Sequence, residues 1–325
     1  MKFSIYSLVQ WPGGRSPRDA FQNELDQLSR AEAQGYQCAW LAEQHLSRDG
    51  IGPSVHLSAA NLAARTSTIR IGTSIAILPF MHPLRIAEEV AMLDIVSEGR
   101  VEWGIGRGYP GRGFEGFGVD LEKSHKLFYE QLEIIQRAWI GDPFAHDGEF
   151  YEFDELRCFP SPIQQPRPPI HIAAQSDDTI VWAAHNHYPV LTDPYSPAGE
   201  LRENRKRYIE AAATVGVDAS ALEIPTVRQV YVGASLKKAR EEVAPGLLEY
   251  YGSLRDEEPA ESLKFVFDEC AIIGDAAYCR DRIAELQETI GLSQLICWQN
   301  FGNLDHEQTL ASQERLMTQV APAFA

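Results

Sequence analysis

The sequence lacks any hydrophobic run that could cross a membrane. A membrane-spanning helix needs roughly 18 consecutive apolar residues, and no stretch of this chain approaches that length. Residues 1–10 are too polar for a signal peptide and contain no small-residue cleavage site, but they are typical of a first β-strand. We therefore expect a cytoplasmic protein with no membrane partner.

Cysteine is also scarce. The 5 cysteines are odd in number, widely spaced and free of C-x-x-C pairs, which favours reduced thiols over a disulfide framework. The histidines include no H-E-x-x-H motif, and His185 and His187 are two positions apart, so they do not face one another on a helix. We therefore predict no metal site.

Positive charge is in short supply. The chain has 29 Lys and Arg against 46 Asp and Glu, which gives a net charge of −17. Nucleic acids and anionic membrane surfaces repel such an acidic body, so neither is an expected partner. The charge favours solubility and does not identify any chemistry.

What the sequence does contain is a regular alternation of strand and helix patterns. The helix at 83–96 is typical, because Pro83 opens it, Gly99 follows its end, and its apolar residues fall on one face. Strands are expected at 3–9, 36–42, 69–78, 101–105, 169–174, 189–191, 223–232 and 294–298. Helices are expected at 19–34, 53–65, 83–96, 124–140, 177–187, 197–215, 236–254, 275–289 and 306–320.

Eight strand–helix steps predict an α/β fold with a parallel sheet, and they close naturally into a (β/α)₈ TIM barrel. We expect residues 1–325 to form a single barrel domain, with an open doubly wound sheet as the alternative. Two segments interrupt the alternation, at about 141–168 and 255–274. Sites in such barrels lie at the C-terminal ends of the strands, and we expect both insertions to cover that face.

The most informative stretch is the glycine-rich segment at 100–118. A short strand runs into a backbone with few side chains, and Arg107 lies among the glycines. Glycines allow a close approach to a bulky ligand, and a guanidinium suits a phosphate. This pattern predicts a site for a nucleotide-type cofactor, with a glycine-rich surface turn as the alternative.

The same segment spells G-x-G-x-x-G through Gly106, Gly108 and Gly111. A dinucleotide fold would need a helix opening within these glycines and an acidic residue roughly 20 positions on, at the end of a second strand. Pro110 and further glycines predict an irregular chain until about Leu121, and the residues near Glu130 belong to a helix pattern. We therefore reject a Rossmann-type site.

A second anion-binding pattern follows the strand at 169–174. Ser176 lies at the expected N-cap of the next helix, and Thr179 lies on its first turn. Free backbone N–H groups, two hydroxyl groups and the helix dipole would favour a phosphate there. Ordinary capping is the alternative, with Ser176 accepting from the Thr179 N–H and with Asp177 and Asp178 compensating the dipole.

Together these motifs resemble the bacterial luciferase-like flavin monooxygenases. The resemblance extends over nearly the whole chain, to the C-terminal segment 296–302 and the final helix. The motifs that carry it are Glu43-Gln44-His45, residues 72–79 with His82-Pro83, residues 104–108 with Phe117-Gly118, and Ala174-Gln175-Ser176 with Thr179.

The resemblance implies a barrel that binds reduced FMN. Arg107, Ser176 and Thr179 would contact the phosphate, with Gln175 as a backbone donor, and Ser74 and Ile75 would form a non-prolyl cis peptide against the flavin ring. Glu43 and His45 would lie near the reactive edge as the catalytic candidates. Tyr109 and Ala174 complete the cofactor-binding candidates.

The resemblance also implies dioxygen as a co-substrate, a small apolar organic substrate, a separate flavin reductase, and a homodimer packed through residues 53–97. One departure concerns Gln44, which stands where luciferases carry a catalytic histidine; a carboxamide does not exchange protons near neutral pH. A deazaflavin-dependent hydride transferase and a flavin-binding barrel without catalysis therefore remain alternatives.

Overall fold

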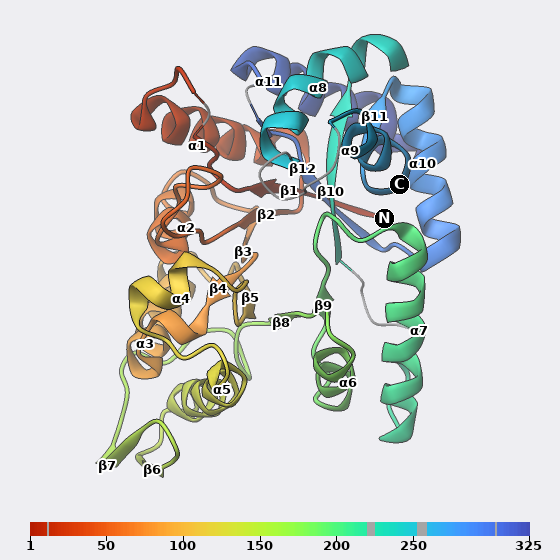
Figure 1. Ribbon diagram of the computed structural model, residues 1–325. Coiled ribbons are helices and arrows are strands. Elements are labelled where there is room, and N and C mark those ends of the chain that lie inside the picture. Colours follow the sequence, from red (N-terminus) through yellow and green to blue (C-terminus); the bar gives the residue numbers. More distant parts are fainter. Residues whose placement is uncertain (12, 220–224, 252–258, 303) are drawn as a thin grey trace.

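The computed structural model describes residues 1–11, 13–219, 225–251, 259–302 and 304–325 (Figure 1). Its centre is a curled, parallel sheet whose neighbouring strands follow the chain order. The ring consists of β1 (Lys2–Ser7), β2 (Cys38–Leu41), β3 (Arg70–Thr73) with β4 (Ala76–Ile77), β5 (Val101–Gly106), β8 (Ile170–Ala173), β9 (Val190–Leu191), β10 (Pro225–Val232) and β12 (Gln294–Trp298), which pairs with β1.

The two ends of this sheet meet at a narrow seam. Strand β9 has only two residues, and a single parallel bridge joins Thr192, directly after it, to Thr226 in β10. The predicted α/β barrel is confirmed, and the open doubly wound sheet was the wrong alternative. Among the described residues, every helix is either too short or too polar to span a membrane.

Helices cover the outside of the sheet (Figure 1). Two helices, α3 (Pro83–Val96) and α5 (Ser124–Ile140), have the predicted bounds at both ends. In each, a proline or a glycine marks one end: Pro83 is the first residue of α3, and Gly141 follows α5 in a left-handed conformation with φ of 85°. The helices are α1 (Pro17–Gln34), α2 (Val55–Ala63), α3 (Pro83–Val96), α4 (Arg112–Phe117), α5 (Ser124–Ile140), α6 (Asp177–His185), α7 (Ala198–Thr214), α8 (Leu236–Tyr251), α9 (Pro259–Phe265), α10 (Ala276–Ile290) and α11 (His306–Arg315).

Two expectations near the strand ends were wrong. The strand expected at 69–78 is divided into β3 and β4 by the peptide bond between Ser74 and Ile75, which is cis. The chain expected to be irregular until about Leu121 forms the short helix α4 instead. Phe114 of α4 is buried and packs edge-on against Phe80 at 5.1 Å, so tertiary packing outweighs the low helix propensity of the glycines.

The first expected insertion does not cover the C-terminal ends of the strands. It contains the hairpin β6 (Phe144–Asp147) and β7 (Glu152–Leu156), in which His146 bonds to Glu130 on α5. Its later part lies at the opposite end of the barrel, because Gln164 bonds to Arg70 at the start of β3 and to the carbonyl of Val101 at the start of β5. The hairpin itself folds back along the outside of α5, where Glu149 pairs with Lys126 at 3.0 Å and the ring of Tyr151 lies 5.0 Å from His82 at the start of α3.

The second expected insertion includes regular structure. Residues 255–258 lie outside the described residues, but α9 and a further short strand, β11 (Ile272–Gly274), follow them. Strand β11 pairs with residues 230–232, at the C-terminal end of β10. The segment therefore extends the sheet at the predicted end of the barrel.

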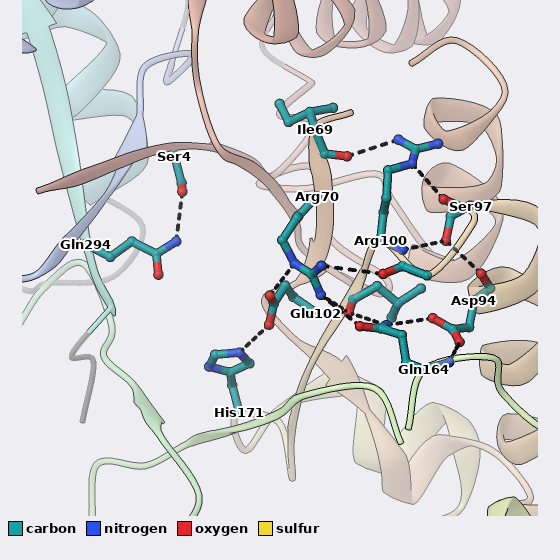
Figure 2. Close-up of polar contacts among 12 residues, drawn as sticks. Ser4, Ile69, Arg70, Asp94, Ser97, Arg100, Glu102, Gln164, His171 and Gln294 are labelled. Carbon is teal, nitrogen blue, oxygen red and sulfur yellow. Dashed lines mark hydrogen bonds and ion pairs between the residues drawn. The ribbon is translucent and has the colours of Figure 1, made fainter. Parts of the chain in front are cut away.

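A polar network holds the N-terminal end of the barrel together (Figure 2). Glu102 bridges Arg70 and His171, the latter at 2.8 Å. The buried guanidinium of Arg100 donates to the carbonyls of residues 63, 66, 69 and 97 at 2.7–3.1 Å. Arg100 thus joins the ends of α2 and α3 to the start of β3.

Replacing Arg100 with Met should lower the free energy of unfolding by about 3 kcal/mol, because several buried carbonyls lose their charged donor. Urea denaturation at neutral pH measures this change. The matched control is Arg65→Met at an exposed position on the same connection, which should change stability by less than about 0.5 kcal/mol. Equal effects of the two substitutions would contradict this role for Arg100.

At the C-terminal end, the loops after β1 and β12 are bonded to each other and to α1. Asn300 donates to the buried carboxyl of Glu24, and Arg15 donates to the carbonyl of Leu304. Burial raises the pKa of Glu24 to about 7, although its hydrogen bonds and Arg15 oppose the shift. Glu24 therefore favours a proton near neutral pH.

This raised pKa predicts a stability that depends on pH. The folded chain holds the Glu24 proton more tightly than the unfolded chain, so the contribution is complete below pH 4.5 and is lost as the pH rises through about 7. Relative to Glu24→Gln, the wild-type free energy of unfolding should fall by about 3 kcal/mol between pH 4.5 and 8. Denaturant titrations across this range test it, and parallel profiles for the two proteins would refute it.

Candidate functional site

The two predicted catalytic residues form a bonded pair after β2. The Nε2 atom of His45 lies 2.7 Å from Oε1 of Glu43, and the Glu43 side chain is almost fully buried. The other carboxylate oxygen accepts the Ile77 N–H at 3.3 Å, and the Glu43 N–H donates to the carbonyl of Ile75 at 3.3 Å. Glu43 therefore links His45 to the backbone of Ile75, just before β4, and of Ile77, the last residue of β4.

The backbone beside this pair contains the cis peptide that the resemblance implies. It joins Ser74 to Ile75, and the Ser74 N–H donates to the carbonyl of Leu41 at 2.6 Å. On the neighbouring strand, a Cβ atom at Gly106 would lie 2.3 Å from Cδ1 of Ile75. Glycine at 106 is thus required for the position of the Ile75 side chain. A flavin contact at residues 74 and 75 stays a prediction.

Aromatic rings cover His45 on one side. Its ring lies 4.8 Å from Phe117 and 5.5 Å from Phe80, both edge-on, and the two phenylalanines stack at 4.9 Å. Sequence reasoning missed this wall. The spacing of Phe114 and Phe117, with Phe80 after the third strand, is the only pattern in the sequence that pointed to it.

The predicted phosphate residues lie together on the same rim. Arg107 donates to the hydroxyl of Ser124 at 3.1 Å. Burial raises the pKa of Tyr129, while a hydrogen bond with Thr179 and the charge of Arg107 lower it, so this phenol is close enough to interact with both. Ser176 and Thr179 share a hydroxyl contact of 2.9 Å. Arg107 and the start of α6 therefore approach a common space.

Ser176 also caps α6 in the ordinary way, by accepting the Thr179 N–H at 3.4 Å. This capping bond satisfies only the Thr179 N–H. The N–H groups before it in the first turn have no helical acceptors, so they remain compatible with an anion. Sequence reasoning missed Ser124, Tyr129 and also His125, whose pKa is lowered by burial and then by the charge of Arg107. All three lie on α5, which no motif connects to the strand ends.

Gln175 joins three of the rim loops through its side chain, whereas only its backbone was expected to bind. Its amide donates to Tyr109 at 3.2 Å and to Asp193 at 2.8 Å. Tyr109 is 62% exposed, whereas Ala174 is buried. The cofactor-binding roles predicted for these residues stay predictions.

More aromatic rings line the rim beyond β1. Trp298 lies 5.6 Å from Tyr6 and 5.0 Å from Tyr250, and Tyr250 stacks on Tyr195 at 6.2 Å. Tyr6 and Trp298 belong to β1 and β12, whereas Tyr195 and Tyr250 were not identified from the sequence. No cluster of three or more potential metal ligands occurs in the described part of the chain.

Comparison with known proteins identifies the family. The family model described as luciferase-like monooxygenase matches residues 1–293. The oxygenase component of a flavin-dependent trigonelline monooxygenase from Acinetobacter baylyi is 29% identical over 352 residues, covering 100% of this chain and 96% of the relative.

Two solved structures show the same fold. The monooxygenase RslO1 from Streptomyces bottropensis superposes with a TM-score of 0.93 at 23% identity, covering 100% of both chains. The oxygenating constituent of 3,6-diketocamphane monooxygenase from Pseudomonas putida, in complex with FMN, gives 0.85 at 20% identity, covering 99% of this chain and 98% of that chain. This chain belongs to the luciferase-like family of flavin-dependent monooxygenases.

Proposed function

We propose that this protein is the oxygenase component of a two-component monooxygenase. It would use FMN reduced by a separate reductase, together with dioxygen, to oxygenate a small apolar organic substrate. The observation that carries the proposal is the rim, where a bonded Glu43–His45 pair beside the cis peptide shares one end of the barrel with the cluster of Arg107, Tyr129 and Thr179. The relative from Acinetobacter baylyi, named as an oxygenase component, supports the reductase partner.

The residues present fit the charge of the FMN phosphate. Arg107, the hydroxyls of Ser176 and Thr179, and the free N–H groups at the start of α6 would hold the phosphate. Gly106 leaves room for the side chain of Ile75, because a Cβ atom at residue 106 would lie 2.3 Å from Cδ1 of Ile75. Reduced FMN, when bound, supplies the electrons that activate dioxygen. The structure bound to FMN from Pseudomonas putida supports this choice of cofactor.

His45 would hold and move the proton in the reaction. With Glu43 accepting from Nε2–H, the other ring nitrogen, Nδ1, is the basic atom of the neutral imidazole. Glu43 fixes this tautomer and keeps the ring in place, and it stabilises the imidazolium when His45 is protonated. The aromatic wall of Phe80 and Phe117 excludes water from this side of His45.

We also infer that the protein is a homodimer. Large apolar side chains are exposed on neighbouring faces of α2 and α3, including Leu57 at 73%, Met92 at 57% and Val96 at 51% exposed. Exposed apolar patches of this kind are typical of contacts between proteins. The resemblance to luciferases implies packing through the same residues, 53–97.

Replacing Arg107 with Ala should weaken FMN binding by about 2 kcal/mol, or roughly thirtyfold, as expected for the loss of a charge-assisted contact. Fluorescence titration of the apo-protein with FMN measures the dissociation constant. Arg112→Ala, an exposed arginine on the adjacent helix α4, is the control and should leave it unchanged. An unchanged constant for Arg107→Ala would remove this residue from the site, and tighter binding of a deazaflavin would favour the hydride transferase.

Replacing His45 with Gln should lower the yield of oxygenated product per FMN oxidised by about a hundredfold, the usual scale for a lost proton-transfer group. Affinity for FMN should remain within about threefold, since the phosphate contacts are intact. Glu43→Gln should have a smaller effect in the same direction, because the amide still holds the ring.

These assays use a purified flavin reductase, dioxygen and a panel of carbonyl and aromatic substrates, with His185→Gln on the exposed end of α6 as the control. An unchanged product yield for His45→Gln would remove His45 from catalysis. If the wild-type protein binds FMN but yields no product with any substrate, the result would support the alternative of a flavin-binding barrel without catalysis. That alternative rests on Gln44, which stands where luciferases carry a catalytic histidine.

A further inference from the structure

The loops that follow β1 and β12 meet at the rim beside a buried carboxyl group, that of Glu24 on α1. Glu24 is only 3% exposed, and the side-chain amide of Asn300 donates to its Oε2 atom. The hydroxyl of Ser7 and the backbone of Val9 are close enough to lower its pKa. A single side chain from α1 therefore contacts both loops.

Asn300 connects Glu24 to the aromatic rings of the rim. The indole N–H of Trp298 donates to the backbone carbonyl of Asn300 at 2.7 Å. The ring of Trp298 in turn lies 5.6 Å from Tyr6 and 5.0 Å from Tyr250. A displacement of Asn300 would therefore change the surroundings of Trp298 through one hydrogen bond.

The two loops are also bonded to each other and packed against α8. The N–H of Gly302 donates to the side-chain oxygen of Gln10. Gly302 has a φ of 61°, and a Cβ atom there would lie 2.1 Å from the Cα atom of Gly246 in α8. The loop after β12 thus lies directly on the helix that carries Tyr250, so a shift of this loop would reach a second ring of the rim.

Glu24 is stable in this position chiefly as the neutral acid. A buried carboxylate is costly unless a charged partner and hydrogen bonds compensate it. Burial raises the pKa of Glu24 to about 7, although nearby hydrogen bonds and the charge of Arg15 oppose the shift. Above that pH, an arrangement of the loops that lets water reach the carboxylate becomes more favourable.

We propose that Glu24 is a proton-controlled positioning residue for the aromatic rings of the rim. With its proton, Glu24 holds Asn300 and the two loops in the observed arrangement. Without the proton, the carboxylate takes up water, Asn300 moves with it, and the surroundings of Trp298 change. This coupling follows from the fold and does not depend on the proposed flavin chemistry.

Three titratable groups on neighbouring elements must be distinguished from Glu24. Tyr6 of β1 stays neutral, because burial raises its pKa well above the usual value. Arg15 stays charged, because a guanidinium does not lose its proton in proteins. His306 of α11 bonds to Asp26 of α1 at 3.1 Å. Because histidine titrates near neutral pH, His306 is the competing source of a pH response.

The indole N–H signals of the full chain, labelled with ¹⁵N-tryptophan, test the proposal without flavin. Trp298 reports on the loop after β12, and Trp11, which donates to the carbonyl of Arg15 at 2.7 Å, reports on the loop after β1. Between about pH 5.5 and 8.5, both signals should shift with a common midpoint near 7. The signal of Trp139, which donates to the carbonyl of Ala87, should not shift.

Variants identify the group that titrates. Glu24→Gln should hold both signals at their low-pH positions throughout this range, because an amide cannot ionise. Asp19→Asn removes the same charge at an exposed position on the same helix and should leave the titration unchanged. His306→Gln should also leave it unchanged, and this variant tests the proposal even if Glu24→Gln folds poorly. Trp11→Phe and Trp298→Phe assign the two signals.

The proposal is overturned if neither signal shifts in the wild-type protein, if both shift alike in Glu24→Gln, or if His306→Gln abolishes the shifts. Loss of FMN binding by the wild-type protein would instead overturn the proposed function, and the indole titration would be unaffected.

Discussion

The position of the site depends on one constraint, the parallel direction of every strand in the ring. Parallel strands bring all the loops that follow them to one rim, so groups more than a hundred residues apart in the chain share a single surface. Glu43 follows β2, the cis peptide follows β3, Arg107 follows β5 and Gln175 follows β8. Loss of pairing between β2 and β5, through β3, would separate Arg107 from His45.

The sequence predicted those parts of the fold that local chemistry determines. Helices α3 and α5 were predicted to the residue because proline and glycine restrict the backbone at their ends. Helix α4 was missed because its glycines disfavour a helix locally, while the burial of Phe114 against Phe80 forms it through distant contacts. The segment after the hairpin was misplaced because its proline-rich sequence does not show which end of the barrel it contacts.

The residues of the candidate site also differ in whether local sequence predicts them. Residues next to strand ends, such as Glu43 and Arg107, could be predicted because their place in the sequence also gives their place in the barrel. Their supporting residues could not, since Ser124 and Tyr129 lie on α5 and Tyr250 lies on α8. Only one end of each helix lies at the rim. Which side chains at that end point toward the site depends on tertiary packing, and no local sequence pattern shows it.

The proposed phosphate site lies in a chain of net charge −17. Arg107 donates to the hydroxyl of Ser124 rather than to a carboxylate, so no neighbouring carboxylate bonded to it offsets its charge. At physiological salt, charges on distant surfaces are screened over about 8 Å, whereas a half-buried guanidinium acts at contact distance with little screening. The acidic surface therefore does not oppose anion binding at Arg107, and recognition of a phosphate depends on the local contacts of this arginine.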